Sequence, residues 1–292
     1  MMKVAYYPGC SLHGLAKEYG ISVELVCKHL GINLNEIEDW NCCGATAAHS
    51  LNHELTISLS ARNLAIARDM KMDKILAPCA GCFSRLKGAS YELRNNKALA
   101  AEVAEIIQTQ APVEPEVNNL LQFIMEEPGL LDAIKSKVVK PLKGLKLAAY
   151  YGCLLTRPKE VVQFDDPELP VSMDLILKAL GADTVAWGHK AECCGGGYAA
   201  SDTDIVLDLS GQVLESAQKA GADAIVVACP MCGVNLDTRQ EAVGALKGKK
   251  YDMPIVYLTQ LMGIAFGFYP VQLGMKRHLN SPFPVLQSRG LA

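Results

Sequence analysis

Short apolar runs alternate with longer amphipathic stretches along the whole 292-residue chain. Lys3 to Pro8 and Lys146 to Tyr151 are compact runs of this kind, and each ends just before a Gly-Cys pair. Lys74 to Ala77 and Ala224 to Ala228 repeat the pattern and also end near a cysteine. Continuous apolar runs of this length are typical of strands buried on both faces, as in a parallel sheet. We therefore expect four matching strands, two in each half of the chain.

The clearest helical pattern spans Asp204 to Ala220, where small and apolar residues recur every three or four positions. Asp204 suits the N-terminus of such a helix and Lys219 its end, because they complement the helix dipole. Leu55 to Met70 occupies the same place in the first half. Helices that alternate with strands predict an α/β architecture, and the same order of elements is built twice.

The halves meet in a proline-punctuated stretch from Ala111 to Gly144. We place the boundary near residue 140, which gives a first domain of residues 1–140 and a second of residues 141–292. Pro115 to Leu121 corresponds to Pro254 to Gln260, so we expect each repeat to continue this far. After Tyr269 the chain shows no period, and we expect this tail to wrap the body or to dock on a partner.

Composition narrows the class of protein. A hydrophobic share of 50% and a charged share of 20% are enough for two modest domains, each with its own core. The net charge of -3, without a Lys/Arg run, argues against nucleic acid or an anionic membrane as the main partner. The first residues lack the apolar segment of a secretory signal, so we expect a cytoplasmic protein. Ile255 to Tyr269 is too short for the ~20 residues of a spanning helix and is expected to be a core helix.

One constellation of cysteines occurs twice. A single cysteine is followed by an adjacent Cys-Cys-Gly and then by a Cys-x-x-Cys, with intervals of residues 11–41 and 44–78 in the first copy and 154–192 and 195–228 in the second. Cys27 is left over and is expected to be a buried structural thiol. The repeated set comprises Cys10, Cys42, Cys43, Cys79, Cys82, Cys153, Cys193, Cys194, Cys229 and Cys232.

Metal ligation explains these cysteines better than disulfide bonding. The count of 11 is odd, export is not expected, and a disulfide between neighbours such as Cys42 and Cys43 is strained. In a parallel sheet, ligands gather at the carboxyl ends of the strands, where these cysteines fall. The helices that follow point backbone N–H groups at them and so favour the thiolate form.

The cysteine count also bears on the kind of metal. A mononuclear zinc site takes four ligands, commonly from two Cys-x-x-Cys pairs, whereas each half offers five cysteines and one such pair. Successive side chains such as Cys42 and Cys43 point apart, which favours a polynuclear iron–sulfur cluster over one ion. A four-iron cube takes four thiolates, so five leave open a spare thiol or a cluster of unusual shape.

The repeated pattern resembles the CCG (cysteine-rich) domain family. A chain of this length that holds two such domains and little else resembles the family of B subunits of the soluble heterodisulfide reductases of methanogens. It lacks the ferredoxin-type Cys-x-x-Cys-x-x-Cys run of the fused subunits of membrane-bound reductases and of glycolate- or lactate-oxidising relatives. The resemblance implies two pseudo-symmetric, Rossmann-like half-domains. It also implies one noncubane [4Fe-4S] cluster in each, bound by its five cysteines, and no flavin or nucleotide on this chain.

The resemblance further implies an activity and partners. The family reduces CoM-S-S-CoB, the mixed disulfide of coenzyme M and coenzyme B, to two thiols in the last step of methanogenesis. Cleavage takes two electrons and an iron–sulfur cluster normally passes one, so two clusters facing one pocket meet the requirement. Electrons are expected from a ferredoxin-like C subunit of heterodisulfide reductase, fed by the flavin-containing A subunit and a hydrogenase or formate dehydrogenase. No nucleic acid or membrane is expected as a partner.

Two alternatives stay open. One is an iron–sulfur electron-relay subunit of a glycolate-, lactate- or succinate-type or other thiol-linked oxidoreductase, which does not touch substrate. The other is a zinc-stabilised scaffold.

Anionic groups on the implied substrate require cationic or N–H donor groups near the cysteines. Arg157, His189 and Lys190 rank first because they flank the second copy's cysteines, ahead of the further candidates His13, His49 and Lys159. Gly195 to Gly197 lacks the spacing of a phosphate-binding loop, so we expect it to let the backbone close on the metal. Gly44 is expected to do the same in the first half. Trp40 and Trp187 are expected to shield the metal from water by packing.

Overall fold

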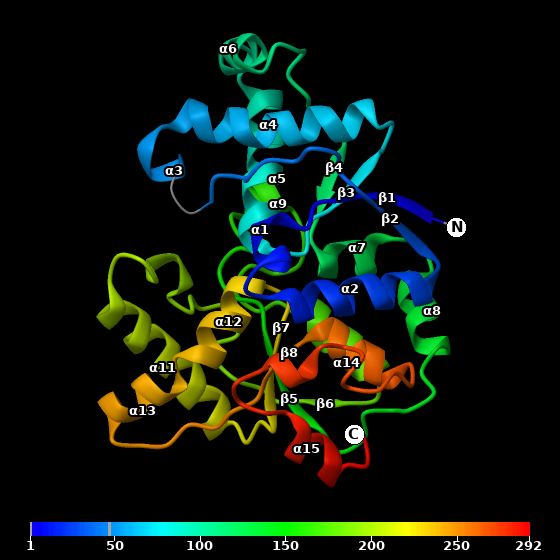
Figure 1. The fold of residues 1–292 in the computed structure, drawn as a ribbon, viewed down its shortest axis with the longest axis vertical. Coiled ribbons are helices and arrows are strands. Elements are labelled where there is room, and N and C mark those ends of the chain that lie inside the picture. Colours follow the sequence, from blue (N-terminus) through cyan, green and yellow to red (C-terminus); the bar gives the residue numbers. More distant parts are fainter. Residues whose placement is uncertain (1, 46–47) are drawn as a thin grey trace.

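The computed structural model describes residues 2–45 and 48–292 and contains two parallel four-stranded sheets with helices packed around them (Figure 1). The strand orders are β2-β1-β3-β4 and β6-β5-β7-β8, so the second sheet repeats the first. This confirms the predicted α/β class and its two similar halves. The strands are β1 (Met2–Tyr6), β2 (Ile32–Glu36), β3 (Lys74–Leu76), β4 (Glu116–Asn118), β5 (Lys146–Tyr150), β6 (Asp183–Thr184), β7 (Ala224–Val227) and β8 (Ile255–Tyr257).

The four strands predicted from apolar runs are β1, β3, β5 and β7, and they are the two central strands of each sheet. Every residue of β7 is buried, as expected for a strand covered on both faces. Leu76 and Val226 each lie three residues before the first cysteine of a Cys-x-x-Cys, and they pair with Asn118 of β4 and Val256 of β8. The segments after Pro115 and Pro254 thus form the equivalent fourth strand of each sheet, as predicted, but the structural alignment is shifted by one residue, since Asn118 matches Val256 and not Tyr257.

One segment differs from its prediction. Ile255 to Tyr269 was expected to be a single core helix, but its first three residues form β8 and the helix α14 begins at Leu258. Ile255 and Val256 are β-branched residues and pair with β7, which gives their backbone hydrogen bonds inside the sheet. The burial of α14 agrees with the prediction.

Helices occupy the connections between strands. The predicted helices near residues 55–70 and 204–220 are α4 and α11, and the side chains of Asn52 and Asp202 cap them. The first half contains α1 (Gly9–His13), α2 (Lys17–Leu30), α3 (Ala48–Leu51), α4 (His53–Asp69), α5 (Ala80–Asn95), α6 (Lys97–Ile107), α7 (Leu120–Glu126) and α8 (Leu130–Ser136). The second contains α9 (Lys159–Val162), α10 (Ser172–Ala179), α11 (Thr203–Lys219), α12 (Pro230–Thr238), α13 (Gln240–Lys247), α14 (Leu258–Ala265), α15 (Phe283–Ser288) and the short 3₁₀ turns η1 (Gly196–Tyr198) and η2 (Met275–Arg277).

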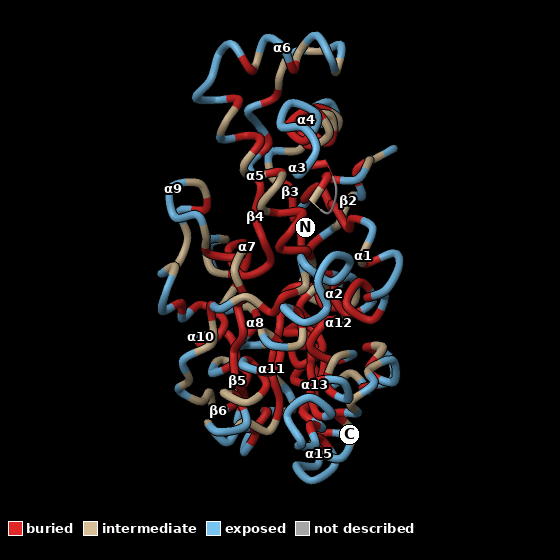
Figure 2. Tube along the Cα trace, turned by 90° about the vertical axis from the view of Figure 1, so that its left-hand side faces the viewer, coloured by how far each residue is buried: buried red, intermediate tan, exposed pale blue. Residues whose placement is uncertain are grey.

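The two halves interlock in a reciprocal way. α14 of the second half packs on α2 of the first, and α7 and α8 of the first half pack on α10 of the second. The ring of Tyr19 stacks on that of Tyr257 with centroids 4.3 Å apart, and the hydroxyls of Ser22 and Thr259 are 2.6 Å apart. Buried residues therefore continue through the middle of the molecule from one sheet to the other (Figure 2). The boundary near residue 140 stays a prediction.

The C-terminal tail lies on the body, one of the two expected arrangements. Arg277 forms an ion pair with Glu18 on α2, and the carboxylate of Asp237 on α12 accepts hydrogen bonds from the backbone of Leu279 and Asn280. The tail thus contacts both halves. Among the described residues, none of the helices combines the length and the apolar character required to span a bilayer.

Candidate metal centre

Each half gathers its cysteines at the carboxyl ends of its two central strands. Cys10 follows β1 at the start of α1, and Cys79 follows β3 and immediately precedes α5. In the second half Cys153 follows β5, and Cys229 follows β7 and immediately precedes α12. The Cys-Cys-Gly segments also lie at the carboxyl ends of these strands. Cys43 Sγ is 3.4 Å from Cys82 Sγ, and Cys194 Sγ is 3.5 Å from Cys232 Sγ. Each of these contacts is a hydrogen bond between two thiols.

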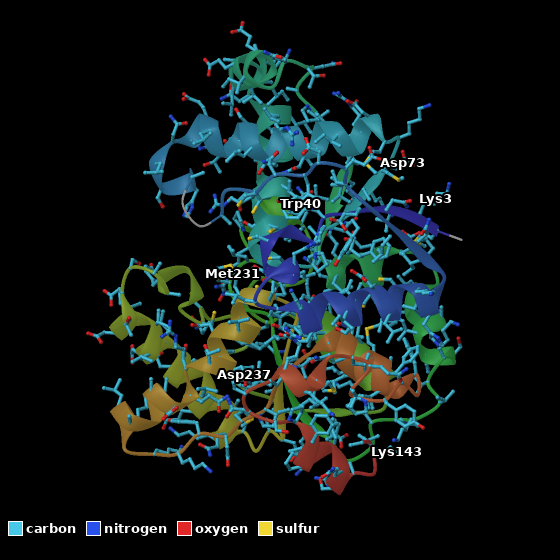
Figure 3. The ribbon with its side chains drawn as sticks, viewed as in Figure 1. Lys3, Trp40, Asp73, Lys143, Met231 and Asp237 are labelled. Atoms are coloured by element: carbon cyan, nitrogen blue, oxygen red, sulfur yellow. The ribbon has the colours of Figure 1, made fainter. Side chains whose placement is uncertain are left out.

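The two groups of sulfurs also meet across the interface between the halves. Cys79 and Cys229 are close enough to affect each other's pKa values. The contact with Cys229 raises the pKa of Cys79, whereas the contact with Cys232, followed by that with Cys79, lowers the pKa of Cys229. Met231, at the N-terminus of α12, lies where the second half meets the first (Figure 3). Its sulfur is 3.5 Å from the position that a Cβ on Gly81 of α5 would take. The N-termini of α5 and α12 therefore face each other.

Glycines let the backbone come close to the sulfurs. Gly9 and Gly152 have φ values of 64° and 65°, and each immediately precedes the first cysteine of its half. A Cβ on Gly9 would lie 2.8 Å from Cys82 Sγ, and one on Gly152 would lie 3.2 Å from Cys232 Sγ. Conformation and space therefore both disfavour a side chain at Gly9, and one at Gly152 would require Cys232 Sγ to move by a few tenths of an ångström.

The Cys-Cys-Gly turns aim backbone donors at the sulfurs. Gly44 N–H donates to Cys42 Sγ at 3.4 Å, and Gly195 N–H donates to Cys193 Sγ at 3.3 Å. Gly196 N–H donates in turn to Cys194 Sγ at 3.4 Å. Such bonds favour the thiolate form that metal ions require. The first two glycines of the Gly195–Gly197 run thus close on the cysteines as expected, and Gly197 has open space around it.

A tyrosine in each half supports the segment that carries the adjacent cysteines. The Tyr7 hydroxyl donates to the carbonyl of Asn41 at 2.6 Å, and the Tyr150 hydroxyl donates to the carbonyl of Glu192 at 2.6 Å. Trp40 meets the ring of Tyr7 edge-on with centroids 5.5 Å apart, and the ring of Trp187 is tilted against that of Tyr150 at 6.0 Å. Both tryptophans are partly buried and so pack on the tyrosines that hold the cysteine segments.

The pKa values show what the donor set can hold. The hydrogen bond from Cys82 lowers the pKa of Cys43 to about 7, and the hydrogen bond from Cys153 lowers the pKa of Cys193 to about 6. The same two bonds raise the pKa of Cys82 and of Cys153. In each pair, one thiol thus loses its proton readily, and the other keeps its proton more strongly than a free cysteine does. Complete ionisation of the set requires added positive charge, which a bound metal cluster supplies, so these residues fit an iron–sulfur cluster.

Across residues 2–45 and 48–292, no three His, Cys, Asp or Glu side chains are grouped so that they could hold one metal ion.

Exposure differs between the two sides of each cysteine group. Cys10 and Cys42 are exposed, and Cys153 and Cys193 are partly exposed. The cysteines on the inner side, Cys79, Cys82, Cys229 and Cys232, are buried. Each group therefore has an outer edge near solvent and an inner edge at the interface between the halves.

A model of the cysteine-rich domain, called CCG, matches residues 4–87 and 147–237. The chain belongs to the CCG family. It is 33% identical to the 8-methylmenaquinol:fumarate reductase membrane anchor subunit of Wolinella succinogenes, over 94% of this chain and 96% of that one. It is 31% identical to the B subunit of the ferredoxin:CoB-CoM heterodisulfide reductase of Methanosarcina mazei, over 95% of this chain and 94% of that one. The expected resemblance to the family of B subunits is thus confirmed, and the chain is of the heterodisulfide reductase type of iron–sulfur protein.

A solved structure from Helicobacter pylori, described as a hypothetical protein, shares the fold. It superimposes with a TM-score of 0.74 at 13% sequence identity and covers 96% of this chain and 52% of the other. At that identity the likeness concerns the fold alone.

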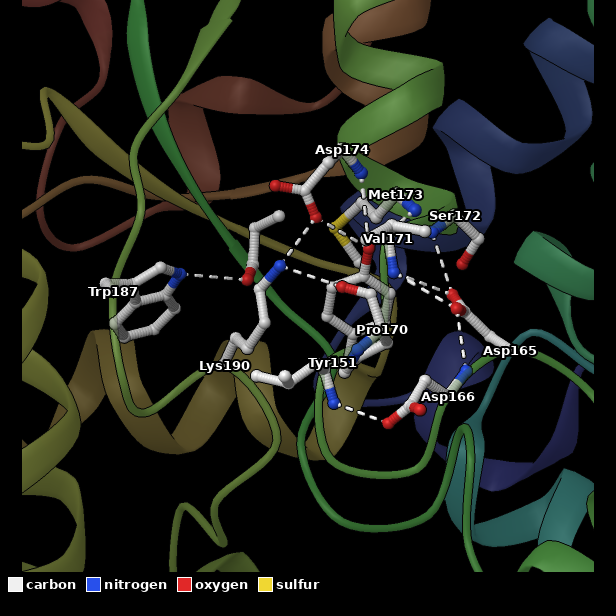
Figure 4. Close-up of polar contacts among 12 residues, drawn as sticks. Tyr151, Asp165, Asp166, Pro170, Val171, Ser172, Met173, Asp174, Trp187 and Lys190 are labelled. Carbon is white, nitrogen blue, oxygen red and sulfur yellow. Dashed lines mark hydrogen bonds and ion pairs between the residues drawn. The ribbon is translucent and has the colours of Figure 1, made fainter.

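Two of the three leading substrate candidates in this CCG chain are engaged within the second half. The Arg157 guanidinium donates to the carbonyls of Pro167 at 3.0 Å and Ala191 at 3.2 Å. Lys190 Nζ donates to the carbonyl of Pro170 at 2.8 Å and to the Asp174 carboxylate at 2.9 Å (Figure 4). Both cations thus hold loops of the second half in place. A role of Arg157 and Lys190 in binding substrate stays a prediction.

The third candidate, His189, is different. Its Nδ1 is buried and has no hydrogen-bond partner within the described part of the chain. Of the further candidates, His13 lies 3.5 Å from Glu36, while His49 and Lys159 are exposed on the surface. Cys27 is buried, as expected, and burial raises the pKa of its thiol to about 12.

A buried polar network connects the two loops that carry Cys153 and Cys193 (Figure 4). Tyr151 donates its hydroxyl to the Asp174 carboxylate at 2.8 Å and accepts the N–H of Met173 at 2.7 Å. The N–H of Tyr151 donates to the carbonyl of Lys190 at 2.7 Å. The partners of Tyr151 in this network, Met173, Asp174 and Lys190, lie in the longer interval of the second copy, residues 154–192. Pro8 takes the place of Tyr151 in the first copy.

Sequence reasoning missed Arg85 and Asn235. Arg85 follows Cys82 by three positions on α5, its Nε is buried, and its positive charge contributes to the lowered pKa of Cys43. Asn235 follows Cys232 by three positions on α12, and its amide donates to the carbonyl of Cys194 at 2.6 Å. The spacing is a usable signal, because residues three apart on a helix share a face.

Proposed function

We propose that this chain binds two iron–sulfur clusters through its ten repeated cysteines and reduces the disulfide CoM-S-S-CoB to two thiols. The observation that carries the proposal is the approach of the N-termini of α5 and α12 from opposite halves, where Met231 Sδ lies 3.5 Å from the Cβ position of Gly81. Cys79 and Cys229 are the N-cap residues of these two helices, so the inner edges of the two sites come together. Cleavage of a disulfide consumes two electrons and two protons. When bound, two clusters supply the electrons one at a time, and adjacent sites serve both sulfurs of one substrate.

The residues of the chain have definite roles in this proposal. The five cysteines of each half hold one [4Fe-4S] cluster, proposed to be noncubane. Gly9 and Gly152 keep side chains away from the sulfurs, and Tyr7 and Tyr150 hold the segments that carry the adjacent cysteines. The interlocked halves fix the separation of the two sites, so a substrate can meet both without a conformational change.

The electrons must come from other proteins, because the two proposed clusters are the only redox groups that the proposal assigns to this chain. We propose a ferredoxin-like C subunit as the direct electron donor. The C subunit would receive its electrons from the flavin-containing A subunit, which would receive them from a hydrogenase or formate dehydrogenase. Relatives named as B and D subunits of heterodisulfide reductases favour a multi-subunit complex of this type.

One observation favours a second function. The Wolinella relative is named as part of a fumarate reductase, and that name specifies fumarate rather than a disulfide. In that case the clusters relay electrons to another protein of the complex and meet no substrate.

The experiment that separates the two functions uses the anaerobically purified protein. Iron and acid-labile sulfide in the amounts of two four-iron clusters are expected. Electron paramagnetic resonance spectra are then recorded with and without the coenzyme M thiol. A cluster signal that changes with the thiol supports substrate contact, and an unchanged signal in fully loaded protein supports the relay.

A further inference from the structure

The two candidate clusters have different charged neighbours although their cysteines match one for one. Arg85 and Asn235 occupy the same place in the two halves, three residues after Cys82 and Cys232 respectively. Residues three apart on a helix lie on one face, so each side chain extends beside the last cysteine of its half. A cation in the first half thus stands where the second half has a neutral amide.

The charge of Arg85 is not neutralised by a neighbour. Its Nε is buried, and no carboxylate pairs with its guanidinium within residues 2–45 and 48–292. The three remaining residues, Met1, Thr46 and Ala47, carry no acidic side chain by sequence. Arg85 shares a helix face with Cys82, whose sulfur lies 3.4 Å from that of Cys43.

The residues near the cysteines of the second half add negative rather than positive charge. Asn235 is neutral, and its amide is bound to the carbonyl of Cys194 and to the hydroxyl of Ser210. Glu192 immediately precedes Cys193 and carries a negative charge, whereas the first half has the neutral Asn41 in that place. The nearby cation Lys190 is already paired with Asp174.

We propose that these differences make the two clusters inequivalent, with the cluster of the first half the stronger electron acceptor. This inference rests on the proposed function, because it requires both clusters to be present. Adding an electron makes a cluster more negative, so a nearby fixed cation stabilises the reduced state and a nearby anion destabilises it. Arg85 contributes more than Glu192, because Glu192 is exposed and solvent screens its charge.

The difference between the clusters sets the order in which they are reduced. The first electron reduces the cluster of the first half, beside Arg85. The second electron reduces the cluster of the second half, which is then the stronger reductant of the two. Removal of the charge at residue 85 is expected to reduce this difference without changing the cysteines.

The test is a redox titration of the loaded protein followed by electron paramagnetic resonance, with signals assigned to each half by the variants Cys43→Ser and Cys194→Ser. Arg85→Met removes the charge and keeps much of the length, and Arg85→Lys keeps the charge. Arg85→Met is expected to lower the reduction equilibrium constant of the first cluster about tenfold, which is about 59 mV for one electron, and to leave the second cluster unchanged. Arg85→Lys is expected to retain most of the original value.

Glu192→Gln supplies an independent measurement on an exposed side chain. It is expected to raise the potential of the second cluster, by less than Arg85→Met lowers that of the first. Equal potentials in the unmodified protein, or potentials that neither variant moves, overturn the inference. If Arg85→Met fails to load its clusters, the result of Glu192→Gln decides. A protein that binds no iron contradicts the proposed function itself, so the two failures are distinguishable.

Discussion

Cys79 and Cys229 belong to opposite halves of the chain, yet they approach each other at the facing N-termini of α5 and α12. Both cysteines are buried, whereas the exposed members of the set are Cys10 and Cys42. The duplication of the fold therefore produces two neighbouring sites that share an inner edge. This relationship distinguishes a paired centre from two independent metal sites that happen to occur in one protein.

Replacement of Cys79 or Cys229 by serine is expected to remove iron from the affected half and to abolish disulfide reduction, because each loses a buried ligand. The matched control is Cys27→Ser, which replaces a buried cysteine outside the repeated set. Iron and sulfide analysis measures the result. Full iron content in Cys79→Ser would exclude this residue as a ligand.

Gly9→Ala is expected to impair cluster assembly, because its Cβ would lie 2.8 Å from Cys82 Sγ. Gly31→Ala separates this contact from backbone strain, since Gly31 also has a positive φ of 78° but has open space around it. Both variants carry the cost of about 1–2 kcal/mol for a left-handed residue. Only Gly9→Ala is expected to lose iron, and equal iron content in the two variants would show that the close contact does not matter.

Tyr7→Phe and Tyr150→Phe each remove a hydroxyl that holds the residue before the adjacent cysteines. Each is expected to lower the free energy of unfolding by about 1–3 kcal/mol, since a partly buried carbonyl loses its donor. Urea titration measures the change. Tyr269→Phe is the control, because Tyr269 is 73% exposed. If the free energy of unfolding falls no more than it does in the control, these tyrosines do not support the cysteine segments.

His278 is expected to make stability depend on pH. Burial lowers its pKa below the ordinary 6.5, against the opposing effect of Asp237. The unfolded state therefore binds more protons than the folded state as pH falls below 6.5, so stability is lost there and is retained above it. Urea titrations of the unmodified protein and His278→Gln at several pH values measure the difference between them. A difference that does not vary across this window would contradict the assignment.

Much of the fold follows from local patterns in the sequence. The four central strands are continuous apolar runs, and α4 and α11 have regular spacing and capping residues. The cysteine positions follow too, because parallel strands place their carboxyl ends together. β8 is short and continues directly into α14, so one apolar run contains both and periodicity does not separate them.

The polar residues near the site are harder to predict. Arg157 and Lys190 flank cysteines in the sequence, but their partners lie in the loop between Pro167 and Asp174. Only the three-dimensional arrangement of that loop shows that both cations are engaged. Arg85 was missed for the converse reason, since its relation to Cys43 depends on α5 meeting a segment that is far away in the chain.

The most direct test of the account is the electron paramagnetic resonance spectrum of the anaerobic, fully loaded protein with and without the coenzyme M thiol. Two neighbouring clusters that meet a disulfide substrate predict a signal that changes when the thiol is added, and loss of that change in Cys229→Ser. An unchanged spectrum in protein with full iron content would contradict substrate contact at the paired centre.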